Sequence, residues 1–259
     1  MTNSNKPFVL DVLQLYCQRP LNVSDKIVIY QPTVGQIVDY GELDFYSMLY
    51  VFIGNTTMFR LKLWEAGHDW NTISDYELFS IMVTGLPQKA TEIIFGDVDF
   101  SLFQLDTMFN EEKQEEVIIL NNIEQDIIID EDIYKLIALC LRTMFGIFPK
   151  NEFARNKVTK EAIIWEDKEN LRIRELNKKD KYDSTLLSMI SSCVNHPGFK
   201  YKKKELEDVG IFEFMDAVQR LQVYESTTAL LKGAYSGFMD TSKIDKEEFN
   251  FMRDIKKSS

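Results

Sequence analysis

The chain has few residues of the types that bind metals or perform nucleophilic chemistry. Its 259 residues include three cysteines and two histidines. Cys17, Cys140 and Cys193 are an odd number, lie far apart and form no C-x-x-C pair, which is typical of a reduced intracellular protein rather than a disulfide-stabilised one. Because only His68 and His196 are present, a metal site would have to depend on carboxylates. We therefore expect no metal and no other cofactor.

Long apolar runs are also absent. No stretch reaches the roughly 18 uncharged apolar residues that a membrane helix needs. The start of the sequence has no basic segment followed by an apolar one, which is the pattern of a secretory signal. We expect neither membrane insertion nor export.

The glycines do not form a phosphate-binding loop. Gly35 and Gly41 lie in the stretch IVIYQPTVGQIVDYGELDFYSMLYVF, but their spacing fits neither G-x-x-x-x-G-K-[ST] nor G-x-G-x-x-G. Residues 26–30 are β-rich and end before a proline, and Thr33 with Gln36 fits a capping box at the start of a helix. The simplest interpretation is a strand, a corner and a helix.

Pairs of residues that resemble catalytic groups are few. His68 and Asp69 are adjacent, and a carboxylate can tune a histidine base, so a small hydrolase is one hypothesis. Cys193 lies three residues before His196, but its apolar surroundings favour a buried structural thiol. Residues 240–251 fail the calcium-loop pattern at its sixth and twelfth positions. The sequence favours a protein that is not an enzyme.

Charge is distributed unevenly along the chain. Residues 1–149 have 9 Lys and Arg against 22 Asp and Glu, a net charge of 9 − 22 = −13, and residues 150–259 have 21 against 19, a net charge of +2. An acidic first half would repel a phosphate backbone. Protein partners are favoured, and nucleic acid is not expected.

The hydrophobic periodicity predicts a helix-dominated α+β fold. We expect an acidic α/β portion at residues 1–149 and a helical portion at 150–259 packed on it, either as two domains or as one. Residues 117–120 and 127–129 predict a β-hairpin, and Asp130 or Asp132 caps the next helix, which we expect to end at Gly146. Other expected helices span residues 57–66, 74–83, 159–179, 184–194 and 211–224, and a last amphipathic segment spans 244–255. The helix at 74–83 begins with a capping box at Ser74.

Two groups of side chains are candidates for binding a partner. One is the basic cluster of Lys202, Lys203 and Lys204, which we expect to form a patch with Arg172, Arg174, Lys178 and Lys179; a solvated face is the alternative. The other is a set of large apolar residues that we expect at the surface, although each one would also fit a core. This set is Phe8, Phe59, Trp64, Trp70, Phe212, Phe214, Tyr224 and Phe238.

The order of these signals resembles a family. The segments IxIxQPTVGQIVDYGE, FYSMLY, LWEAGHDW, ISDYELF, EIIFGDVDF, IIID, IYKLI, LRTMFG, PGFKYK and LLKGAYSGFMD together resemble morphogenesis proteins of tailed phages that infect Gram-positive bacteria. Within that group the chain looks like a tail assembly chaperone.

The resemblance implies partners and a location. Its partners would be other phage morphogenesis proteins, including the tape-measure protein, and it would act in the host bacterial cytoplasm. It would hold the tape-measure protein before the tail tube forms around it. The alternative is a structural component of the virion, such as a connector or baseplate subunit.

Overall fold

The protein is an α+β structure in which helices dominate, as the sequence predicts. The computed structural model describes residues 9–110, 114–177, 184–237 and 240–255, so Phe8, Lys178, Lys179 and Phe238 lie outside the described residues. The α-helices are α1 (Val12–Tyr16), α2 (Val34–Tyr40), α3 (Glu42–Ile53), α4 (Arg60–Glu65), α5 (Asp75–Val83), α6 (Gln88–Phe95), α7 (Glu131–Phe145), α8 (Lys157–Asn177), α9 (Thr185–Val194), α10 (Lys203–Leu206) and α11 (Ile211–Tyr235). The strands are β1 (Leu21–Asn22), β2 (Val28–Ile29), β3 (Gln104–Asn110), β4 (Glu115–Asn122) and β5 (Ile127–Ile129), and short 3-10 helices occur at η1 (Phe100–Leu102) and η2 (Lys246–Phe249).

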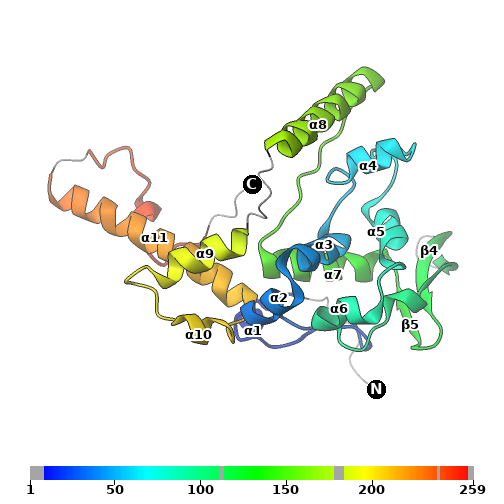
Figure 1. Ribbon diagram of the computed structural model, residues 1–259, viewed down its shortest axis with the longest axis horizontal. Coiled ribbons are helices and arrows are strands. Elements are labelled where there is room, and N and C mark those ends of the chain that lie inside the picture. Colours follow the sequence, from blue (N-terminus) through cyan, green and yellow to red (C-terminus); the bar gives the residue numbers. More distant parts are fainter. Residues whose placement is uncertain (1–8, 111–113, 178–183, 238–239, 256–259) are drawn as a thin grey trace.

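The molecule is long, with different elements at its two ends (Figure 1). The sheet containing β4 and β5 lies at one end, and α11 extends toward the other. The helices α3 and α7 contact each other between these ends. The helix α8 projects from one side of this body, next to α4. No helix in the described ranges has the length and apolar character required to cross a membrane.

The glycine-bearing stretch near the N-terminus is a corner, as predicted. Thr33 and Gln36 form a capping box, with Gln36 N donating to Thr33 Oγ1 at 3.2 Å and Thr33 N donating to Gln36 Oε1 at 2.9 Å. Gly41 separates α2 from α3 with a φ of 95°, a conformation that favours glycine. A Cβ on Gly35 would lie 2.8 Å from the carbonyl oxygen of Glu207. Gly35 therefore permits two distant segments to approach.

The main core is built around α3, α5 and α7. The ring of Phe52, which is fully buried, packs against Phe79, Phe95 and Phe100 with centroid distances of 5.9, 4.6 and 5.1 Å. Asp130 caps α7, so the open choice between the two aspartates is resolved. This helix ends at Gly146, as expected.

The larger sheet extends the predicted hairpin by one strand. β4 pairs antiparallel with β5, with Leu120 opposite Ile129, which confirms the hairpin. β3 pairs along its whole length with β4, and the sheet order is β3-β4-β5. The sequence analysis assigned no structure to β3.

The C-terminal part differs from expectation in two places. α11 continues past residue 224 to Tyr235, because the segment contains no proline that would end the helix. Within it, the hydroxyl of Thr227 donates a hydrogen bond to the carbonyl oxygen of Glu248 at 3.1 Å. Within residues 244–255 only η2 is helical, so the expected amphipathic segment is mostly turns. Arg253 Nη1 donates to Thr227 Oγ1 at 2.7 Å and fastens these turns to α11.

Candidate functional site: the surface around α4 and α8

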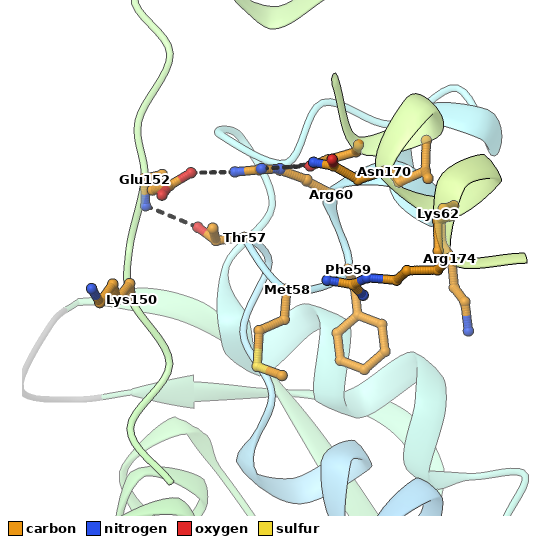
Figure 2. Close-up of a pocket in the computed structure, with 12 residues that line it drawn as sticks. Thr57, Met58, Phe59, Arg60, Lys62, Lys150, Glu152, Asn170 and Arg174 are labelled. Atoms are coloured by element: carbon orange, nitrogen blue, oxygen red, sulfur yellow. Dashed lines mark hydrogen bonds and ion pairs between the residues drawn. The ribbon is translucent and has the colours of Figure 1, made fainter. Parts of the chain in front are cut away.

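Ion pairs connect the helix α8 to the rest of the chain. Arg60 of α4 donates two hydrogen bonds to Asp167 of α8, at 2.6 Å from Nε and 2.7 Å from Nη2. Its Nη1 also pairs with Glu152 in the segment before α8, so Arg60 lies between that segment and the helix (Figure 2). The hydrogen bond to Asp167 raises the pKa of Arg60 above its usual range. One guanidinium therefore holds two separate segments in place.

Trp70 does not lie at the surface, and the expected exposure is wrong for this residue. Trp70 is 2% exposed and belongs to a small second core with Leu63 and Ile164, and Trp64, which is half-buried, packs against this cluster. The two indole rings meet edge to face at 5.9 Å. Ile163 and Ile164 of α8 pack in the same cluster. Both tryptophans fix α8, and a role for them in binding a partner stays a prediction.

The pair His68 and Asp69 contributes to the same attachment. The Asp69 carboxylate pairs with Lys160 of α8 and accepts a hydrogen bond from Asn71 N at 3.1 Å. The hydrogen bond from Lys160 lowers the pKa of Asp69. His68 is exposed. Since Asp69 already holds a lysine, the hydrolase hypothesis gains no support from this geometry.

A groove of about 560 Å³ lies between α4 and α8, and its lining is cationic (Figure 2). Lys62, Lys150 and Arg174 line it, and none of them forms an ion pair with any residue that the structure describes. Phe59 and Leu171 supply apolar surface beside them. Uncompensated cations next to apolar side chains suit an acidic, partly apolar segment of a partner.

The face of α8 that points away from α4 has an apolar stripe. Val158, Trp165 and Leu176 are 76%, 69% and 72% exposed, and the exposed Ala162 lies between the first two. Val158, Ala162 and Trp165 follow one another in steps of four and three residues, and Leu176 lies on the same line three turns further along. Between Trp165 and Leu176 this line is occupied by Glu169 and Arg172, which pair with each other. That line is opposite Lys160 and Asp167, which pair with Asp69 and Arg60. We call these four residues the α8 stripe.

The predicted basic patch is divided in the structure. Lys202, Lys203 and Lys204 are exposed around α10, whereas Arg174 lines the α4–α8 groove and Arg172 pairs with Glu169 on α8. Figure 1 shows α10 and α8 on opposite sides of the molecule. The prediction of a single basic patch that includes both groups is therefore wrong. The three lysines by themselves remain candidate residues for binding a partner.

Phe214 and Phe212 fix the start of α11, and the expected exposure is wrong for Phe214. Its side chain is fully buried in the main core, while Phe212 is half-buried and meets Tyr16 edge to face at 6.5 Å. The N–H of Phe212 donates to Gln31 Oε1 at 2.9 Å. Buried aromatics at this point attach α11 to the N-terminal corner. A role for them in partner binding stays a prediction.

Cys193 and His196 share an apolar groove of about 390 Å³ between α9 and α11. His196 Nδ1 accepts a hydrogen bond from Gly198 N at 3.0 Å, and its Nε2 lies 3.4 Å from Glu225 Oε1. Both ring nitrogens are thus engaged. Cys193 is buried, which raises the pKa of its thiol and supports the structural role expected for it. In the described part of the chain, no group of three or more His, Cys, Asp or Glu residues could hold a metal ion.

Comparison with known proteins gives one match. Residues 177–256 match the family model described as YomV second domain, which indicates a phage-related protein. The match covers less than half of the chain. No curated protein and no solved structure matches the chain at a significant level. The matched part begins at the end of α8, and the boundary predicted at residue 149 stays a prediction.

Proposed function

We propose that the chain is a non-enzymatic phage protein that binds other phage proteins during tail assembly. In this role it resembles a tail assembly chaperone that holds the tape-measure protein. The phage relationship is supported by the match of residues 177–256 to the YomV second domain. The binding role is supported by the α8 stripe, which is the observation that carries the proposal.

The α8 stripe suits an apolar helical partner. Val158, Ala162 and Trp165 are spaced by four and three residues, which is the spacing at which two amphipathic helices contact each other, and the ion pair of Glu169 and Arg172 separates them from Leu176. The stripe is fixed in place from behind, because Arg60 and Lys160 tie the opposite side of α8 to the body. A partner helix would therefore meet a rigid surface that needs little ordering on binding.

Charged residues beside the stripe add selectivity to its apolar contacts. Glu161 and Glu166 flank Trp165 on the exposed side of α8, and the cationic groove lies on the other side of the helix. Apolar contacts supply affinity, and the flanking charges discourage partners of the wrong sign. A client with acidic and apolar segments would engage both features.

The proposal is tested in bacteria infected by a phage that encodes the chain. An affinity-tagged chain should co-purify with phage tail proteins, and the variant V158S/W165S/L176S should lose them. The matched control is I123S, because Ile123 is 79% exposed at a distant turn between β4 and β5. Retention by the triple variant, or loss only in I123S, would overturn the binding role of α8.

The composition of the mature particle separates a chaperone from a virion component. Mass spectrometry of purified virions should find the chain absent or in trace amounts. Stoichiometric copies in the virion would replace the chaperone with a connector or baseplate subunit.

A further inference from the structure

The strand β3 is an unprotected edge of the three-stranded sheet. Among the described strands it pairs with β4 alone, and every residue from Gln104 to Phe109 is exposed. Leu105, Met108 and Phe109 are 55%, 41% and 56% exposed. Edge strands usually avoid pairing with other chains through charged side chains, lysine above all, or through proline, a bulge or short length. β3 has seven residues, pairs without a bulge and contains neither lysine nor proline.

The hydrogen bonds show which residues of β3 offer their main chain to a further strand. In an antiparallel ladder, alternate residues point both main-chain groups toward the partner strand and the others point them away. Thr107 N donates to the carboxylate of its neighbour Asp106 at 2.8 Å, which places Thr107 in the outward set. Leu105 and Phe109, two positions to either side, belong to the same set. Leu105, Thr107 and Phe109 together provide three N–H and three C=O groups on the outer side of the strand.

We propose that β3 pairs antiparallel with β3 of a second copy of this chain, with the two Thr107 residues facing each other across a two-fold axis. In this register Leu105 of each copy lies opposite Phe109 of the other, so all six outward groups of one strand meet those of its mate. The sheets of the two copies become one six-stranded sheet. This pairing does not depend on the phage role proposed above.

The side chains of β3 are self-complementary in this register, as a two-fold interface requires. Leu105 and Phe109 share a face with Ile118 and the buried Leu120 of β4, so apolar surface continues from the core across the axis. The only charged residue of β3, Asp106, lies opposite Met108 and not opposite its own equivalent. No like charges on β3 are directly paired, whereas such pairs oppose association.

Asp106 regulates access to this edge. Its carboxylate already accepts from Thr107 N, so the second strand must displace one hydrogen bond in each copy. This competition weakens the pairing and keeps it reversible. The chain is then monomeric when dilute and dimeric when concentrated.

The test is a sedimentation-velocity concentration series of the full chain and three variants. The wild type should pass from monomer to dimer. L105E and F109K should each raise the dissociation constant about tenfold or more, because each change acts twice by symmetry and replaces an apolar cross-strand pair. The double variant L105E/F109K should recover dimerisation, since each new carboxylate then faces a new ammonium of the other copy.

A disulfide probes the axis directly. The substitution C17S first removes the one exposed cysteine. In this background, T107C should form an intermolecular disulfide under mild oxidation. D106C should form much less of this disulfide, because position 106 faces Met108 of the other copy. A wild type that stays monomeric throughout the series, a double variant that remains as weak as the singles, or equal crosslinking by T107C and D106C would overturn the proposal. Circular dichroism of each variant confirms that the chain has folded.

Discussion

The ion pair between Arg60 and Asp167 should couple the docking of α8 to the body by a measurable free energy. Both side chains are mostly buried, at 18% and 23% exposed, and two hydrogen bonds join them. A hydrogen bond to a charged group contributes about 1.5–3 kcal/mol where it is buried, and an exposed ion pair contributes less than about 1 kcal/mol. This partly buried, two-point pair lies between these limits, so we expect a coupling energy of about 2 kcal/mol.

The assay is a double-mutant cycle with R60M, D167L and the double variant, read by urea unfolding at pH 7. R60M should cost more than D167L, because it leaves two carboxylates, Asp167 and Glu152, without their partner. The double variant should cost about 2 kcal/mol less than the sum of the singles. Amide exchange locates the effect: protection of α8 should fall about 30-fold in R60M, the equivalent of 2 kcal/mol, because the stability of a helix within a protein comes mostly from its packing on the rest of the fold.

Protection of the buried helix α7 is the internal control for this cycle. It should change much less than that of α8, because only the attachment of α8 is broken. A coupling energy below about 0.5 kcal/mol, which is the error of additivity for unrelated sites, would refute the reasoning. Equal losses of protection in α7 and α8 would also refute it.

Three further predictions concern other parts of the chain. G35A should lower the free energy of unfolding by about 1–3 kcal/mol, because a Cβ would lie 2.8 Å from a backbone oxygen, whereas G85A, with its nearest neighbour at 3.9 Å, should be nearly neutral in the same urea assay. Lys160 lowers the pKa of Asp69, so the stabilisation from this pair is complete above the unfolded pKa of about 4 and is lost as the pH falls through the lower folded value. The stability advantage of wild type over D69N should therefore shrink below about pH 4, and an equal advantage at pH 7 and pH 2 would contradict it. At neutral pH only Cys17 should react rapidly with a thiol reagent, since burial raises the pKa of the other two thiols; three fast equivalents would count against the core as described.

The local signals in the sequence predicted much of the fold. The capping boxes at Thr33 and Ser74 form as expected, because a cap involves residues only three positions apart. The Gly146 helix end and the hairpin of β4 and β5 follow from similarly local chemistry. In each case the partner residues lie close in the sequence.

The burial of aromatic side chains could not be predicted in the same way. Trp70 is covered by a helix that lies almost a hundred residues later, and Phe214 is covered by the N-terminal half. Composition gives the amount of apolar surface but does not say which distant element covers it. The strand β3 was missed for a related reason, since all its described side chains are exposed and the period-two pattern of a half-buried strand is absent.

The candidate surface also depends on distant contacts. Trp165 belongs to a helix that the sequence predicted, and Val158 lies one residue before its predicted start because α8 begins at Lys157. Which face is free was set by Arg60 and Asp69, whose pairing with α8 spans about a hundred positions. A basic cluster in the sequence, by contrast, became two separate groups because its members lie on helices on opposite sides of the molecule.

The proposed function depends most on the binding of a phage protein to the exposed side of α8. A photo-crosslinking amino acid at position 165, introduced into the tagged chain in infected cells, tests this contact directly. We expect one dominant adduct with a phage tail protein, identified by mass spectrometry as the tape-measure protein, and a much weaker adduct from position 123. No adduct from position 165, or the same adducts from both positions, would contradict it.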